Sequence, residues 1–217
     1  MEPADLNSTP STGEELLASS LERFQADDHA RALALLMQAR QAFEGDDEHL
    51  AVCDQREAMI HSDLGDLGQA LRLSTRALAF FEHTGNHTAV AKINTNLGAA
   101  LIRANEPAEA YRRTWTALRL FRSLHAGGFE RATCHENLGI ALQALRRLDH
   151  ASRHFGRAID LLSGTDERRE VIRRGDVLMA LASLTAKRGD LVRAQQLRLE
   201  ALQVFTQLDL PYRRGKM

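Results

Sequence analysis

The chain has 217 residues, of which 44% are hydrophobic and 5% aromatic, and its 28 basic and 29 acidic side chains give a formal net charge of −1. This charge balance gives no global positive field for a nucleic-acid backbone, and no apolar run reaches the roughly 18 residues that a membrane-spanning helix needs. The abundance of alanine, leucine, arginine and glutamate favours helix, so we expect a soluble, cytoplasmic, helical protein that binds neither nucleic acid nor membranes directly.

In chain order, residues 1–13 predict a flexible polar lead-in, residues 14–208 a single helical repeat domain, and residues 209–217 a polar tail. Hydrophobic spacing and turn signals predict ten helices in the repeat domain. Their expected ranges are 14–25, 28–43, 48–63, 67–83, 88–104, 107–124, 129–145, 149–162, 168–187 and 191–208. These helices form five consecutive pairs.

A repeated pattern supports the five pairs. An alanine is followed seven residues later by a second alanine in five places: Ala32 and Ala39, Ala70 and Ala77, Ala110 and Ala117, Ala151 and Ala158, Ala194 and Ala201. A large apolar residue stands four positions after each second alanine, at Phe43, Phe81, Phe121, Leu162 and Phe205. A small residue stands twelve positions before each first alanine, at Ser20, Ala58, Gly98, Gly139 and Ala182. Such small residues predict close packing within each helix pair.

The turns inside the pairs carry a second repeated signal. Gly65 and Gly189 can end a helix in the left-handed region, and the aspartate after each can cap the next helix. Asn105 tolerates the same backbone conformation, and Pro107 suits the first turn of a helix. The corresponding turn of the fourth pair, at Arg146, lacks these residue types.

The alanine pattern, together with Leu97-Gly98 and Leu138-Gly139, resembles the tetratricopeptide repeat. The copies are 38 to 43 residues apart and lack the tryptophan and the closing proline of that family, which is similar to a long-repeat bacterial subgroup. The resemblance implies an all-α fold, a right-handed α–α superhelix of five antiparallel helix pairs. It also implies a concave groove, lined by the first helix of each pair, that binds a peptide or another protein.

Ten residues at groove positions form the predicted binding site: Gln55, Arg56, Met59, Lys92, Asn96, Arg103, Glu136, Asn137, Ile140 and Gln143. Asn96 and Asn137 stand out because a carboxamide can both donate to and accept from an extended peptide backbone. The alternative is that these asparagines bridge neighbouring helices. The arginines and the lysine could instead be ordinary solvated surface charges.

No motif predicts catalysis, a cofactor or a metal. His150 and His154 have the spacing of paired metal ligands but no third ligand, and Cys53 and Cys134 are predicted to be buried packing residues. The sequence therefore predicts a non-catalytic scaffold for protein–protein interaction. A sensory or regulatory module of a bacterial signalling or transcription-control system is the alternative. Apolar residues of the last helix also predict a homodimer through the C-terminal repeat.

Overall fold

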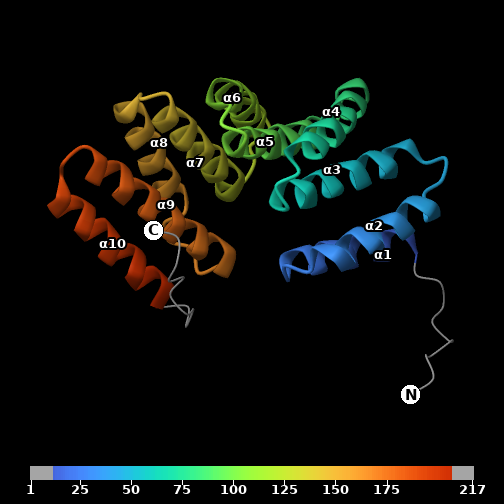
Figure 1. Cartoon of the computed structure of the whole chain (residues 1–217), viewed down its shortest axis with the longest axis horizontal. Coiled ribbons are helices and arrows are strands. Elements are labelled where there is room, and N and C mark those ends of the chain that lie inside the picture. The colour runs from blue at the N-terminus through green and yellow to red at the C-terminus, as the bar shows by residue number, and fades with distance from the viewer. Residues whose placement is uncertain (1–11, 207–217) are drawn as a thin grey trace, which may run out of the picture. The chain divides into compact units, whose positions relative to one another are not determined.

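The computed structural model describes residues 12–206, and these residues form ten α-helices and no strand (Figure 1). The helices are α1 (Gly13–Gln25), α2 (His29–Ala42), α3 (Asp47–Asp63), α4 (Leu67–His83), α5 (His87–Arg103), α6 (Pro107–Ser123), α7 (Gly128–Ala144), α8 (Leu148–Leu161), α9 (Arg168–Lys187) and α10 (Leu191–Thr206). Each begins and ends within a few residues of its expected range, which confirms the ten-helix prediction. Residues 1–11 of the lead-in, residues 207–208 of the expected last helix and the expected tail lie outside the described residues.

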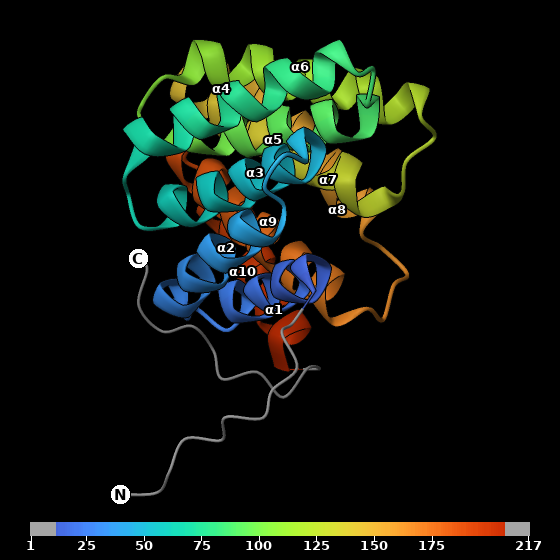
Figure 2. The same cartoon turned by 90° about the vertical axis from the view of Figure 1, so that its right-hand side faces the viewer.

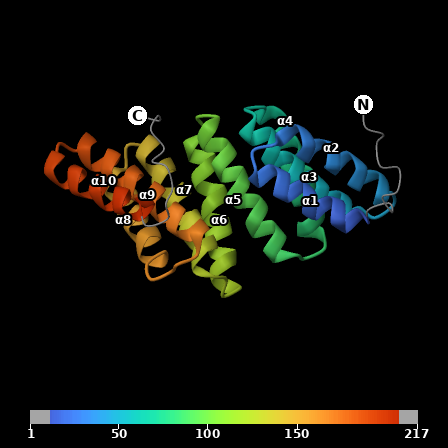
Figure 3. The same cartoon turned by 90° about the horizontal axis from the view of Figure 1, so that it is seen from below.

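The chain divides into two compact units after Ile93, inside α5. In the first unit α1 packs on α2, α2 on α3, and α3 on α4. In the second unit α6 packs on α7, α7 on α8, α8 on α9, and α9 on α10. Figure 2 shows α1 beside α2, and Figure 3 shows α9 beside α10. Within each unit, neighbours in sequence are therefore neighbours in space.

The predicted alanines form the closest helix contacts. All ten are at most 2% exposed, because an alanine lets the backbone of another helix approach without a side chain between them. The large apolar residues that follow them are buried at Phe81, Phe121 and Leu162 and half-buried at Phe43 and Phe205. The repeat is therefore a packing pattern.

Glycines in the first helices allow an equally close approach. A Cβ atom added at Gly139 would lie 2.6 Å from Cε1 of Phe155 on α8, and one added at Gly98 would overlap Oγ1 of Thr114 on α6. Phe155 and Thr114 are fully buried, so neither has space to move away. This confirms the predicted close packing within the third and fourth pairs.

The turns have the predicted chemistry. Gly65, Gly189 and Asn105 adopt positive φ angles of 84°, 90° and 58°. The side chains of Asp66 and Asp190 each accept a hydrogen bond from a backbone N–H in the first turn of the following helix. Arg146 adopts a φ of 60° although arginine is not among the residues that favour this region, so its turn is more strained than the turns at Gly65, Asn105 and Gly189. None of the helices within residues 12–206 is long and apolar enough to cross a membrane.

Candidate functional site

One side of α5 carries three of the predicted groove residues at helical spacing. Lys92 and Arg103 are exposed near its two ends, and Asn96 is half-buried between them. Residues separated by four and by seven positions lie on the same side of a helix, so the three side chains share one face. Lys92 belongs to the first compact unit and the other two to the second. The helix itself presents a polar, basic face.

The two predicted asparagines have different environments. Asn137 is 7% exposed, and its side chain donates a 3.3 Å hydrogen bond from Nδ2 to the backbone oxygen of Thr95, which joins α7 to α5. The side chain of Asn96 is only half-buried and makes no hydrogen bond to any residue in the range 12–206. Asn137 therefore bridges two helices, whereas the carboxamide of Asn96 is available to a ligand.

The remaining predicted residues of α7 also differ in burial: two are accessible and one is buried. Ile140 and Gln143 are half-buried and stay accessible beyond Asn137. Glu136 is buried and accepts a 2.9 Å hydrogen bond from Nη1 of Arg173 on α9. Burial raises the pKa of Glu136, and the charge of Arg173 opposes that rise. Glu136 is thus enclosed by contacts within the second unit.

Arg173 is one of four arginines in the first two turns of α9, with Arg168, Arg169 and Arg174. Together with Arg169 it lies over the ring of Phe129, at 5.7 and 4.6 Å from the ring centroid to the guanidinium carbon. Arg169 also pairs with Glu167. These arginines therefore hold the start of α9 against the start of α7.

In the first unit, Arg56 and Met59 lie together on α3 beside Leu21 and Phe24 of α1, where they line a narrow slot. The guanidinium of Arg56 donates from Nη1 to the backbone oxygen of Leu17. Burial lowers the pKa of Arg56. This side chain therefore fastens α3 to α1, while the half-buried Gln55 beside it makes no comparable contact with a described residue.

Sequence reasoning missed a buried ion-pair network in the first unit. Asp54 is 3% exposed, and its carboxylate accepts hydrogen bonds from Arg40 on α2 and Arg76 on α4. Glu57 accepts further bonds from Nε and Nη2 of Arg40, at 3.2 and 2.9 Å. The sequence signal for this network was Asp54, an aspartate at a position that faces the second helix of its pair.

A histidine pair was also missed. Nδ1 of His154 on α8 lies 3.0 Å from Nδ1 of His135 on α7, so His154 pairs with His135 and not with His150. Burial lowers the pKa of each histidine to about 4, helped at His135 by His154 and nearby arginines and at His154 by Arg157 and His150. Among residues 12–206 no three histidine, cysteine or acidic side chains are grouped so as to hold a metal ion. The positive charges of the nearby arginines also disfavour a metal ion beside His135 and His154.

Both cysteines are fully buried and free, as predicted for packing residues. Burial raises the pKa of Cys134 to about 11 although its Sγ lies 3.5 Å from Oγ1 of Thr95. Its thiol is therefore a poor nucleophile at neutral pH.

Comparison with known proteins identifies the fold and no close relative. No protein-family model matches the sequence, and no curated protein matches it. BtubC from P. vanneervenii has a similar structure, with a TM-score of 0.75 and 18% identity over 94% of this chain and 85% of that one. The TPR-like repeats of a kinesin light chain from Podospora anserina give a TM-score of 0.69 and 15% identity over 90% of this chain and 95% of that one.

A Rap protein complexed with competence and sporulation factor is also similar, with a TM-score of 0.81 and 14% identity. The match covers 94% of this chain and 57% of the Rap chain, so the present chain spans little more than half of that protein. At these identities the likeness concerns the backbone alone. The chain has the fold of a tetratricopeptide-repeat-like solenoid.

Proposed function

We propose that the chain is a non-catalytic scaffold that binds a peptide or another protein on the side of α5 and α7 that carries Asn96, Ile140 and Gln143. Asn96 is the observation that carries the proposal, because its half-buried carboxamide has no hydrogen-bond partner among residues 12–206. A half-buried carboxamide can satisfy both an N–H and a C=O of an extended backbone. Ile140, half-buried on α7, supplies an accessible apolar side chain.

The hydrogen bond of Asn137 decides how this proposal should be tested. Replacing Asn137 would also remove the link from α7 to the backbone of Thr95, so a loss of binding would be ambiguous. Asn96→Ala removes only an unpaired carboxamide. Gln38→Ala, on the exposed side of α2, removes a similar group at a distance from the proposed site along the chain and serves as the matched control.

The experiment compares what the immobilised wild type, Asn96→Ala and Gln38→Ala proteins retain from a cell lysate, with the retained proteins identified by mass spectrometry. We expect at least one protein to be kept by the wild type and by Gln38→Ala and lost by Asn96→Ala. Retention of the same set by all three proteins would contradict a binding site on α5.

A regulatory module that responds to a peptide or effector is the second candidate. The likeness to a Rap protein complexed with competence and sporulation factor, over 94% of this chain, favours it. Under this proposal the ligand retained by the wild type is a small effector, and its addition slows hydrogen exchange in α5. An unchanged exchange pattern in α5 after addition of the retained ligand would argue against regulation through this helix.

A homodimer through the C-terminal repeat remains a separate proposal. Leu191 and Val192 at the start of α10 are 68% and 74% exposed, and Leu199 is 51% exposed. Association would bury this apolar surface. Light scattering should give a mass that rises toward twice the monomer value with concentration, and Val192→Glu should abolish the rise; a constant monomer mass would exclude the dimer.

A further inference from the structure

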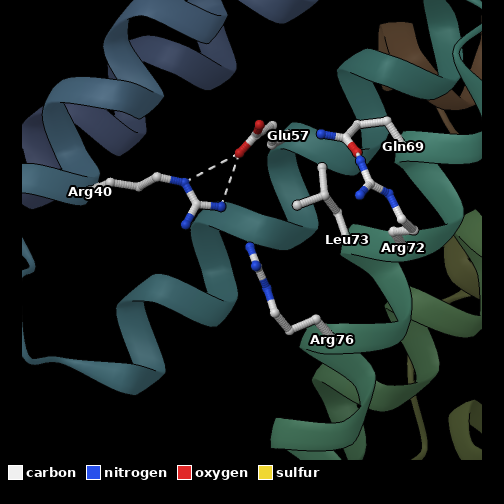
Figure 4. A pocket seen from close by; sticks show the side chains of 6 residues that line it. All are labelled: Arg40, Glu57, Gln69, Arg72, Leu73 and Arg76. Atoms are coloured by element: carbon white, nitrogen blue, oxygen red, sulfur yellow. Dashed lines mark hydrogen bonds and ion pairs between the residues drawn. The ribbon is translucent and has the colours of Figure 1, made fainter.

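A polar pocket in the first compact unit lies outside the proposed binding face. It has a volume of about 240 Å³ and is lined by Arg40 from α2, Glu57 from α3, and Gln69, Arg72, Leu73 and Arg76 from α4. Figure 4 shows the guanidinium groups of Arg40 on α2 and Arg76 on α4 approaching the same space, with Arg72 beside Gln69. Three guanidinium groups in one small pocket are an unusual concentration of positive charge.

The internal contacts use only part of the hydrogen-bonding capacity of these arginines. Arg40 uses Nε and Nη2 for Glu57 and Asp54, and Arg76 uses Nε and Nη2 for Asp54. Arg72 uses Nη2 for Gln69. Nη1 of each arginine, and Nε of Arg72, donate to no residue within 12–206. Because a guanidinium carries five N–H donors, each arginine can still donate to a ligand.

The network beneath the pocket fixes where these donors lie. Asp54 is buried and joins Arg40 to Arg76, so the two guanidinium groups are held in place before any ligand arrives. Burial opposes the charge of Arg40, but the hydrogen bonds and charges of Asp54 and Glu57 outweigh it and raise the pKa of Arg40. Preorganised, permanently charged donors favour anion binding, because less side-chain entropy is lost when the anion binds.

Charge decides which anion fits. Arg40 and Arg76 pair with the two carboxylates of Asp54 and Glu57, and Arg72 lines the same pocket, which leaves a surplus of one positive charge. A carboxylate would neutralise that surplus. A doubly charged phosphate would exceed it and would lie beside the carboxylate of Glu57. Leu73 adds an apolar wall against which the methylene groups of a side chain can pack.

We propose that the pocket formed by Arg40, Arg72 and Arg76 binds the carboxylate of an acidic residue in a bound peptide or protein. This inference rests on the proposed function in that the chain binds a polypeptide. It adds a second contact, in the first unit, and the acidic chemistry that the partner must supply there.

The test uses two capped pentapeptides, one with glutamate between two pairs of glycines and one with glutamine in its place. Nuclear magnetic resonance follows the arginine Nε–H signals of the full chain during titration with each peptide. We expect the signals of Arg72 and Arg76 to shift and saturate with the glutamate peptide and to stay unchanged with the glutamine peptide. Equal shifts with both peptides would overturn the proposal.

Arg72→Gln is the decisive variant, because Arg72 lies outside the Asp54 network and its loss leaves the packing of α2, α3 and α4 intact. It should weaken binding of the glutamate peptide by about tenfold, the effect of one charge-assisted hydrogen bond. Arg31→Gln, which removes an exposed arginine of α2 outside the pocket, is the matched control and should bind as the wild type does. Equal binding by the two variants would refute the site.

Two further arms separate the alternatives. Inorganic phosphate should shift the Arg72 signal less than the glutamate peptide does at equal concentration, and the opposite order would exclude the carboxylate assignment. Asn96→Ala should bind the glutamate peptide as the wild type does, and a loss there would place the carboxylate elsewhere. If Arg72→Gln loses the peptide while Asn96→Ala keeps every lysate partner, the pocket stands and the α5 binding face fails.

Discussion

Arg173 on α9 donates a 2.9 Å hydrogen bond to the buried carboxylate of Glu136 on α7. Arg173→Ala should lower the free energy of unfolding at pH 7 by about 2 kcal/mol, because it leaves a buried carboxylate without its charged partner. Urea unfolding followed by circular dichroism measures the change. Arg168→Ala, at the exposed start of the same helix, is the control and should change stability by less than about 0.5 kcal/mol.

The same pair predicts a pH dependence. The folded pKa of Glu136 is raised above its unfolded value, so between the two values the native state binds more protons than the unfolded state. Stability should therefore fall as the pH rises from about 4.5 through the folded pKa. Glu136→Gln should remove this fall, and Arg173→Ala should extend it to higher pH. Identical pH profiles for the wild type and Glu136→Gln would contradict the assignment.

The histidine pair predicts a loss of stability in acid. The folded pKa of His135 and of His154 is about 4, below the unfolded value, so the unfolded state binds more protons between that value and about pH 6.5. Stability should fall as the pH falls through this window, by at least about 2 kcal/mol between pH 7 and pH 5. The groups that oppose their protonation, besides the two rings themselves, are His150, Arg122, Arg131, Arg153 and Arg157.

The double variant His135→Gln/His154→Gln isolates this contribution. Its unfolding free energy should change less between pH 7 and pH 5 than that of the wild type. His83→Gln removes an exposed histidine of α4 and should keep the wild-type profile. If the double variant loses as much stability in acid as the wild type, the pair is not the cause.

The glycines of the first helices give a fourth prediction. Gly139→Ala should destabilise the protein by about 1–3 kcal/mol, because the added Cβ meets the buried ring of Phe155. Gly156→Ala on α8 is the matched control, since a Cβ there meets no atom within 4 Å. It should stabilise the protein by about 0.5–1 kcal/mol through helix propensity alone. Thermal unfolding should thus move in opposite directions for the two variants.

The features that sequence analysis predicted are those that recur at a fixed offset. Ala32, Ala70 and Ala110 are buried at equivalent packing positions in successive repeats, so the pattern identifies the buried positions and the helix pairs. Sixteen residues before the first alanine of the three middle repeats stand Asp54, Asn94 and His135, all buried and all different. Each makes different polar contacts, so no repeated sequence pattern predicted these buried polar residues.

The groove residues show the same limit. The helical periodicity of the sequence correctly places Glu136 and Asn137 on α7, but it does not predict which residues of other helices contact them. Their burial depends on Arg173 and on the backbone of Thr95, which lie 37 and 42 residues away in the sequence. Helical periodicity describes one helix at a time, and long-range partners of polar groups follow only from the tertiary packing.

Asp54 supports the last prediction, which links stability to binding. Asp54→Asn keeps the shape of the side chain but removes the charge that holds Arg40 and Arg76 together. It should lower the free energy of unfolding by about 1–3 kcal/mol, because hydrogen bonds to a charged group are exchanged for weaker ones. Glu57→Gln, which removes a less buried carboxylate from the same network, should cost less.

The same two variants distinguish preorganisation from net charge in the pocket. Each variant raises the positive surplus by one charge, but only Asp54→Asn frees the guanidinium group of Arg76. If net charge alone governs binding, both variants should bind the glutamate peptide more tightly than the wild type does. We expect Glu57→Gln to bind more tightly and Asp54→Asn to gain less, because the mobile Arg76 loses side-chain entropy on binding. Equal gains in the two titrations would show that the buried aspartate contributes to stability and not to recognition.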